Sequence, residues 1–367
     1  MKWFEYGDEK ISHREILIAI SSILIDVGIL SLPRDLAGDT VGADGWISIA
    51  ISGSIIIFIA WLMARLATSF PRQSFVSYSS KLVSKPIAII VTFIFIAISL
   101  GLAALEVREI SDIAKQYLFD RTPVEALSLA FLLVVVYAVS GSRAGIFRLN
   151  MMFLPIILFI ALAVVVLNIG WFSVENLLPV FETSFEGYAR GLGTGTISYM
   201  GLGIILFYTS LVEKPKKVPR SVVIGTCIPV VLYIVLYITS IGVFGNSVTS
   251  NLIFPVIELA KEVDIPGGFF ERFESIFFVI WIMAIFNTAV MALDIAVLAL
   301  GNVFKSKSKI TLVCILSPIV YVIAMYPEDL INVTTMANYF GYFAIGYTTF
   351  ITIILAIIAK VRKVKKK

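Results

Sequence analysis

Residues 24–34 read LIDVGILSLPR and lie inside an apolar run that extends over about residues 14–36. A transmembrane helix needs about 20 mostly apolar residues, and this run has that length. Asp26 and Gly28 nevertheless stand near its middle, and Pro33 follows one to two turns later. A helix broken inside a bilayer exposes backbone polar groups, which is tolerated only where protein or a cavity covers them. The stretch therefore predicts a broken membrane-spanning helix beside an internal binding site.

The whole chain has the composition of a membrane protein. Its 367 residues are 59% hydrophobic and 15% charged, with a mean hydropathy of +0.97. Soluble domains carry about 25% charged and 45–50% apolar residues, so a soluble enzyme and a disordered scaffold are excluded. One histidine (His13) and two cysteines inside apolar runs (Cys227 and Cys314) argue against a metal site and a disulfide framework. No cofactor is expected.

Ten apolar runs approach the length of a membrane span, although two of them are at the short limit. The chain is therefore predicted to be an all-α integral membrane protein with ten transmembrane helices in one membrane domain, residues 1–367. A short helix on the outer surface is expected near IFPVIELAKEV, residues 253–263. The predicted spans are residues 14–36, 45–70, 86–117, 124–140, 150–169, 187–211, 220–244, 272–303, 310–326 and 336–359.

The basic residues of the loops predict the orientation of these spans. Lysine and arginine gather in every second loop, for example at Arg72 and Lys214, while the loops between them carry acidic residues such as Asp39 and Asp44. By the positive-inside rule, both termini are predicted to be cytoplasmic. The basic cytoplasmic tail, residues 360–367, fits either binding to anionic lipid or a stop-transfer anchor.

Ten spans divide into two sets of five, at about residues 14–169 and 187–359. Many transporters place broken helices at equivalent positions of two inverted repeats, which makes the sixth span the counterpart of the first. It reads GLGTGTISYMGLGIILF, residues 191–207, with Gly201 and Gly203 close to its midpoint. Glycine inside a helix costs about 1 kcal/mol relative to alanine. We expect unwinding at Gly201 and Gly203, which predicts a 5+5 inverted repeat with broken first and sixth helices.

Three further glycines of the sixth span, Gly191, Gly193 and Gly195, fit a backbone role and close helix packing equally well. At the first break, the amides of residues 28–30 would suit a carboxylate. Carbonyls freed at residues 200–203 would suit an ammonium. Backbone amides a few ångströms from backbone carbonyls favour a free amino acid as the ligand.

Several ionisable residues lie within or at the ends of the spans. Asp26 is a functional candidate because a carboxylate at mid-membrane is costly, and the alternative is a protonated side chain bonded to a neighbouring helix. Asp294 has a similar status nearer the cytoplasmic side. Near the outer ends of the third and eighth spans stand Glu106, Arg108, Arg272 and Glu274, which fit either an outer ionic gate or a solvated interface.

Five short motifs resemble the spore germination permease family. They are GILSLPR at residues 28–34, LEVRE at 105–109, FDRTP at 119–123, ERFESIFFVIWI at 271–282 and YFGYF at 339–343. These permeases are the B subunits of nutrient germinant receptors in the amino acid–polyamine–organocation transporter superfamily. The resemblance implies a ten-helix inverted-repeat fold in the inner spore membrane, with A-type and C-type subunits as partners. It also implies that a small nutrient such as an amino acid triggers germination.

The resemblance also implies a pocket where the first, third, sixth and eighth spans meet. Its residues would be Asp26, Val27, Gly28, Ile29, Ile98, Leu102, Met200, Gly201, Gly203, Asn287 and Thr288. The family pattern has Gly-x-Gly in the first span and often an acidic residue after Gly-x in the sixth. Here the first span has Asp26 and the sixth has Gly203, so we hypothesise that the pocket carboxylate has moved to the first helix.

Two functions remain open at this point. One is a receptor subunit that binds an amino acid and passes a conformational change to its partners. The other is a self-sufficient amino acid transporter, coupled to protons through Asp26. A scramblase or ion channel is less favoured because few polar residues line one bundle interior. The chain has no P-loop, GxSxG or HExxH motif, so enzyme activity is not expected, and neither is a nucleic acid partner. The lipid bilayer is its expected surroundings.

Overall fold

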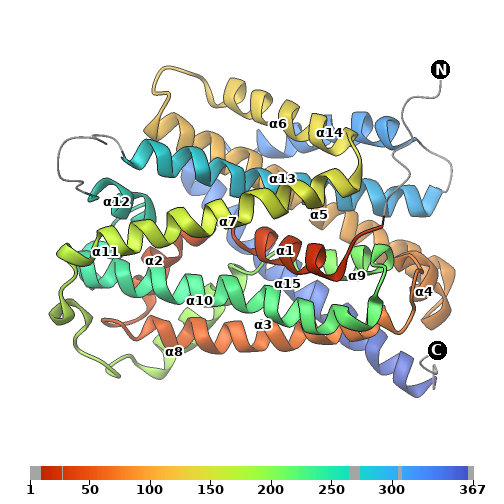
Figure 1. Ribbon diagram of the computed structural model, residues 1–367, viewed down its shortest axis with the longest axis horizontal. Coiled ribbons are helices and arrows are strands. Elements are labelled where there is room, and N and C mark those ends of the chain that lie inside the picture. Colours follow the sequence, from red (N-terminus) through yellow and green to blue (C-terminus); the bar gives the residue numbers. More distant parts are fainter. Residues whose placement is uncertain (1–9, 27, 264–272, 305–307, 363–367) are drawn as a thin grey trace.

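The computed structural model describes residues 10–26, 28–263, 273–304 and 308–362. Within these ranges the chain is helical, with one isolated parallel bridge between Ile11 and Val212 (Figure 1). The helices are α1 (His13–Leu24), α2 (Gly28–Asp39), α3 (Gly45–Thr68), α4 (Phe75–Leu82), α5 (Lys85–Tyr117), α6 (Val124–Ser140), α7 (Arg143–Leu167), α8 (Phe185–Ile197), α9 (Ile204–Tyr208), α10 (Val218–Phe244), α11 (Asn246–Thr249), α12 (Pro255–Lys261), α13 (Phe273–Phe304), α14 (Lys309–Ala324) and α15 (Leu330–Val361).

Among the described residues, six helices are long and apolar enough to cross a membrane, namely α3, α5, α7, α10, α13 and α15. The bent pair α1–α2 makes a seventh if it counts as one span. The apolar helices α6 and α14 are shorter, and the expected sixth span is divided between α8 and α9. The all-helical, multi-span architecture agrees with the sequence analysis, while the count of ten stays a prediction. Helix α12 lies within the segment expected to form a short helix.

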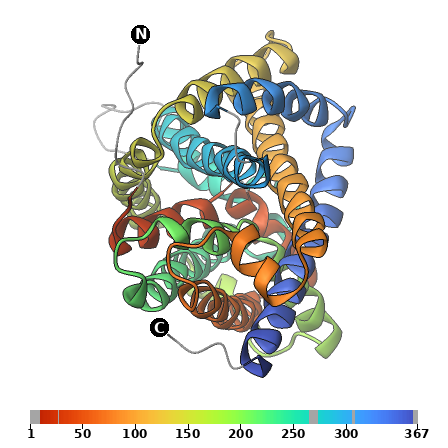
Figure 2. The same cartoon turned by 90° about the vertical axis from the view of Figure 1, so that its right-hand side faces the viewer.

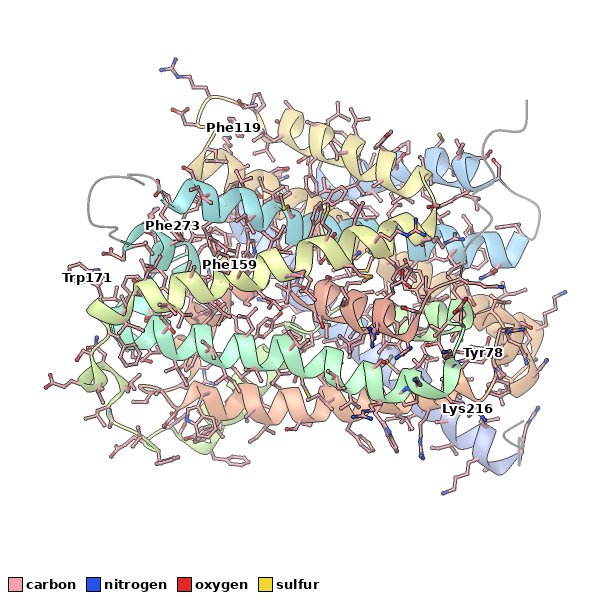
Figure 3. The ribbon with its side chains drawn as sticks, in the orientation of Figure 1. Tyr78, Phe119, Phe159, Trp171, Lys216 and Phe273 are labelled. Atoms are coloured by element: carbon pink, nitrogen blue, oxygen red, sulfur yellow. The ribbon has the colours of Figure 1, made fainter. Side chains whose placement is uncertain are left out.

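The bundle has two distinct ends, with α4 at one and α11 and α12 at the other (Figure 1). We call them the α4 end and the α12 end. Figure 3 places Tyr78 and Lys216 at the α4 end, and Trp171 and Phe119 at the α12 end. Phe159 lies between them on the outside of the bundle and is 71% exposed. Large apolar side chains on the outer surface at mid-height are typical of a protein that faces lipid.

Small residues bring α8 close to α3. A Cβ at Gly191 would lie 2.9 Å from the Ser48 hydroxyl oxygen, and one at Gly195 would lie 2.7 Å from the Ser52 hydroxyl oxygen. A Cβ at Gly193 would lie 2.9 Å from the Tyr342 hydroxyl oxygen of α15. These distances are shorter than ordinary contacts, so all three glycines serve close helix packing. The packing fixes α8, and with it the second helix break, against α3 and α15.

A carboxylate holds the loop before α8 at the α12 end. Asp44, at the start of α3, accepts hydrogen bonds from the Phe181 amide at 2.6 Å, the Thr183 amide at 3.0 Å and the Thr183 hydroxyl at 2.8 Å. Burial alone would raise the pKa of Asp44, but the hydrogen bonds outweigh it and lower the pKa below its ordinary value of 3.8. The ionised form of Asp44 therefore stabilises the folded protein.

This clamp predicts a pH-dependent stability. Asp44→Asn is expected to reduce the free energy of unfolding by roughly 1–3 kcal/mol at neutral pH, because hydrogen bonds to the charged group are weakened. Since the folded pKa lies below the unfolded one, wild type loses this advantage as the pH falls through the folded pKa, below 3.8. Thermal unfolding at pH 7 and below pH 3.8 measures it, with Glu175→Gln on the exposed part of the same loop as control. If the free energy of unfolding differed between wild type and Asp44→Asn by the same amount at both pH values, the ionised Asp44 would not be the stabilising group.

Candidate binding cavity

The first helix break separates α1 from α2, whose axes differ by 52°. Asp26 lies at this break and is 2% exposed. Its Oδ1 atom accepts a hydrogen bond of 2.8 Å from the Gly28 amide, the first of α2. The break is where the sequence predicted it, but the expectation of a free Gly28 amide for a ligand carboxylate is wrong. A short acidic side chain folds back readily onto the amide two residues later, and here it occupies that donor.

The second break lies between α8 and α9, at residues 198–203. Gly201 has a φ of +99°, which residues with a side chain rarely adopt. The carbonyl oxygens of Gly201, Leu202 and Gly203 accept the amides three residues later at 3.2, 3.1 and 3.1 Å. The predicted unwinding is present, but these three carbonyls are not free, since a tight turn follows at once. Each retains one lone pair for a further donor.

Tyr233 of α10 connects the two breaks. Its hydroxyl oxygen hydrogen-bonds to the Leu24 carbonyl at the end of α1, and lies 3.1 Å from the Ser198 carbonyl after α8. The hydroxyl has one hydrogen to donate, so the two carbonyls share it. The ring is 1% exposed and stacks on Tyr199, with 5.3 Å between ring centroids. Tyr233 could not be predicted from the sequence, because nothing in the apolar run of α10 indicates which residue faces the breaks.

A cavity of about 500 Å³ runs from the breaks to the α12 end of the bundle. This volume is in the range of sites for small organic ligands. The predicted residues that line it are Asp26, Gly28, Leu102 and Met200, together with Glu106. Others that line it and were not predicted include Ser31, Arg34, Asp35, Gly38, Asp39, Glu109, Thr194, Ser198, Asn338 and Tyr342.

The spacing of these additional residues in the sequence indicates that several of them share one helix face. Gly28, Ser31, Asp35 and Gly38 follow one another at steps of three and four, which places them on one face of α2. Two pairs of polar side chains in the lining are already bonded. Arg34 Nη2 lies 2.7 Å from Asp35 Oδ1, and the Thr194 hydroxyl donates to Asp39 Oδ2 at 2.8 Å. The face of α2 therefore forms a polar wall between Asp26 and the α12 end.

A second, small cavity of about 30 Å³ lies beside the second break. The predicted residues Ile98, Leu102, Gly201 and Gly203 line it. Apolar residues such as Phe95, Ile204 and Ile345 form most of the remaining wall, with Ser99, Thr348 and Thr349 between them. Leu102 lines both cavities and stands between them. The structure thus divides the predicted pocket into a large polar cavity and a small apolar one.

Several predicted pocket residues line neither cavity. Ile29 and Asn287 are each 1% exposed, and the Asn287 Nδ2 atom has no hydrogen-bond partner within the described part of the chain. The Thr288 hydroxyl lies 3.4 Å from the Ser22 carbonyl, which joins α13 to α1. Val27 lies outside the described residues. Asn287 and Thr288 therefore stand behind the first break instead of in the cavity wall.

The three described residues among the four considered for an outer gate have separate surroundings. Glu106 lines the large cavity, while Arg108 pairs with Asp112 at 2.9 Å and donates to the Ala324 carbonyl at 3.4 Å. Glu274 borders a separate hollow of about 250 Å³ near α12. Arg272 lies outside the described residues, so the gate as a whole stays a prediction. Among the described residues, no group of three or more His, Cys, Asp or Glu side chains could hold a metal ion.

A buried charge cluster lies toward the α4 end of the bundle. Asp294 of α13 is 0% exposed, and its Oδ2 atom lies 3.0 Å from Arg143 Nε and 2.9 Å from the Tyr208 hydroxyl. Its Oδ1 atom lies 3.3 Å from Lys309 Nζ. These partners begin α7, begin α14 and end α9. One carboxylate therefore ties four helices together on the side of the breaks opposite the large cavity.

The sequence matches the family model described as "Spore germination protein" over residues 10–333. It is 40% identical to the spore germination protein GerLB of Bacillus cereus, over 94% of this chain and 93% of that protein. It is 29% identical to the spore germination protein A2 of Bacillus subtilis (strain 168), over 88% of each chain. The family that the short motifs predicted is confirmed, and these relatives are named for germination and not for an enzyme activity.

Two solved structures have a similar fold. MhsT in complex with L-phenylalanine has a TM-score of 0.71 at 15% identity, covering 96% of this chain and 99% of that chain. MHP1, a nucleobase-cation-symport-1 family transporter in a closed conformation with bromovinylhydantoin bound, has a TM-score of 0.67 at 13% identity. That match covers 91% of this chain and 76% of MHP1. At such low identity these likenesses establish the fold alone. The long apolar helices and the family together identify the chain as an integral, multi-pass membrane protein.

The bridge made by Tyr233 predicts that its hydroxyl stabilises both breaks. Tyr233→Phe is expected to reduce the free energy of unfolding by roughly 1–3 kcal/mol, because buried carbonyls lose a donor. Thermal unfolding in detergent measures the change. Tyr137→Phe, on a tyrosine that is 84% exposed, is the matched control and should be neutral. Equal stability of Tyr233→Phe and wild type would show that the bridge does not hold the breaks.

The charge cluster predicts strong coupling between α13 and α7. Removing one partner of a buried pair leaves an uncompensated charge, so Asp294→Asn and Arg143→Gln are each expected to cost roughly 3–5 kcal/mol. The double variant should cost less than the two together, with a coupling energy of roughly 0.5–3 kcal/mol. Lys309→Gln should have a smaller effect, because the Lys309 side chain is 22% exposed. Additive effects of the first two substitutions would refute the coupling.

Proposed function

Because the chain belongs to the spore germination protein family, we propose that it is the permease-like subunit of a nutrient germinant receptor. It binds a small nutrient, in the class of amino acids, in the large cavity at mid-membrane. Binding shifts the bundle between conformations and so triggers germination. A ligand drives such a shift only by binding one state more tightly than the other. The observation that carries the proposal is a cavity of about 500 Å³ that reaches from the α12 end to both helix breaks.

The arrangement around this cavity supports a conformational response. Asp26 and Gly28 at the first break, and Ser198 and Met200 at the second, line the same cavity. A ligand there touches two discontinuous helices at once. Tyr233 also contacts both breaks from behind. A change in the position of either half-helix would therefore pass to the other and to α10.

The finer features of the expected fold and setting are part of the proposal. The bundle has ten spans in two inverted repeats, at about residues 14–169 and 187–359. The α4 end, which carries Lys214 and Lys216, faces the cytoplasm, as the positive-inside rule predicts. Both termini are then cytoplasmic, and the cavity opens outward from the inner membrane of the spore. The chain assembles with A-type and C-type receptor subunits.

A self-sufficient amino acid transporter is the second candidate. The likeness of fold to MHP1, a transporter, favours it. In this case the ligand would also leave toward the α4 end, and the cluster around Asp294 would have to open in each cycle. Uptake of radiolabelled amino acids into vesicles containing the protein alone distinguishes the two. Accumulation without partner subunits would support the transporter.

The receptor function predicts that changes at the first break alter the response to nutrients. A Cβ at Gly28 would lie 2.9 Å from Asp26 Oδ1, so Gly28→Ala displaces that carboxylate. Asp26→Asn replaces the carboxyl group with an amide that cannot ionise, and keeps its shape. In spores that depend on this receptor, both variants are expected to lower the germination rate at least tenfold or to change the preferred nutrient. The assay uses a panel of single amino acids, with protein levels checked by immunoblot.

Matched controls separate a site effect from loss of the protein. Gly346→Ala adds a methyl group where nothing lies within 4 Å, and Asp120→Asn removes a charge from an exposed loop. Both should respond like wild type. If Gly28→Ala and Asp26→Asn germinate normally with every nutrient, the ligand does not bind at the first break.

A further inference from the structure

We propose that the ligand of the large cavity is an organic cation, recognised by its ammonium groups, and that it needs no carboxylate. Basic amino acids and their decarboxylated diamines are in this class. The inference rests on the proposed function, because it names the chemistry of the nutrient bound at that site. It differs from the expectation of a zwitterionic amino acid held by backbone amides and backbone carbonyls. Two observations on different parts of the cavity carry it.

The first observation is that the protein already supplies a carboxyl group to the backbone amide at the start of α2. The amide of Gly28 begins α2 and is the natural place for the carboxylate of an amino acid. Asp26 Oδ1 accepts this amide at 2.8 Å. A ligand carboxylate would have to displace Asp26, and would then lie beside a second carboxyl group at a site that is 2% exposed. The arrangement at the break therefore disfavours a ligand anion and leaves Asp26 to face a ligand cation.

The second observation is the balance of charge around the cavity. Five carboxyl groups line it, from Asp26, Asp35, Asp39, Glu106 and Glu109. Among the described residues of the lining, Arg34 is the single cation, and its guanidinium is already engaged by Asp35 and by the Ile253 carbonyl. A cleft lined by one sign of charge concentrates ligands of the opposite sign.

The bonding of the individual carboxylates agrees with this balance. Asp26 accepts from a backbone amide and Asp39 from the Thr194 hydroxyl at 2.8 Å, and neither donor carries a charge. Such bonds satisfy lone pairs but bring no positive charge to either carboxyl group. Asp26 lies at the break, and the other four carboxyl groups come from α2 and α5, which form two walls of the cavity. A ligand with two separated ammonium groups can therefore meet Asp26 at the break and a second carboxylate nearer the α12 end.

Three compounds of similar length separate the two features of the proposal. L-Lysine has an α-carboxylate and two ammonium groups. L-Norleucine keeps the carboxylate and the chain but lacks the second ammonium, and cadaverine keeps both ammonium groups but lacks the carboxylate. Binding of each to the full-length protein in lipid nanodiscs is measured by calorimetry and by thermal stabilisation, which grows with ligand concentration over the dissociation constant. Sodium chloride at equal ionic strength controls for a simple salt effect.

We expect lysine and cadaverine to bind with similar affinity, and norleucine to bind at least tenfold more weakly. If norleucine bound as tightly as lysine, the proposal of a cationic ligand would be wrong, while the proposed function would still stand. Loss of binding with cadaverine would show that a carboxylate is required and would also overturn the proposal. Stabilisation by sodium chloride alone would point to an inorganic cation. If none of these compounds binds, and the other standard amino acids also fail, the proposed function falls as well.

A pair of variants ties the binding to this cavity. Glu109→Gln removes one carboxyl group of the cavity without changing the break. It should reduce the binding affinity for cadaverine at least threefold more than the affinity for norleucine. Glu175→Gln removes a carboxylate at the α12 end that lies outside the cavity, on an exposed loop. It should leave both affinities unchanged. Equal effects of the two variants on cadaverine would place its binding outside the cavity.

Discussion

A backbone that leaves helical geometry inside an apolar bundle must find its hydrogen bonds within the protein, and the other features of this structure depend on that constraint. The first break meets it with the carboxylate of Asp26, and the second with a tight turn that follows Gly201. Tyr233 serves both from a third helix. Because these groups have to meet at one level, α1, α2, α8, α9 and α10 converge there, and a cavity remains on one side of them.

The distribution of charge differs between the two sides of the breaks. Toward the α4 end, Asp294 is enclosed by Arg143, Lys309 and Tyr208, so its charge is compensated and the helices are tied together. Toward the α12 end, carboxylates outnumber the single guanidinium of Arg34 in the cavity lining that the structure describes. The side toward the α4 end, which faces the viewer in Figure 2, is therefore held together by the protein's own ion pairs. The side toward the α12 end has carboxyl groups that a ligand cation can pair with.

The places where the chain breaks could be predicted, because Asp26, Gly28 and Gly201 violate the apolar helical pattern locally. The groups that satisfy the breaks could not. The Gly28 amide was expected to stay free for a ligand carboxylate, but a short side chain competes for the nearest amide before any ligand does. The role of Tyr233 depends on its contact with both breaks in the folded protein, which the residues around it in the sequence do not indicate. The family could be predicted from short motifs, whereas the number of spans depends on how α6, α8, α9 and α14 meet a bilayer.

The two short helices α6 and α14 have a consequence for the surrounding lipid. They pack against each other and lie together at one edge of the bundle in both views (Figures 1 and 2). With 17 and 16 residues they are about 26 and 24 Å long, whereas the hydrocarbon core is about 30 Å thick. Acyl chains along this edge have to shorten to match, while those beside the more exposed helices α7, with 25 residues, and α15, with 32 residues, do not. The protein thus surrounds itself with a bilayer of uneven thickness, and its thin side is a preferred place for lipids with short or disordered tails.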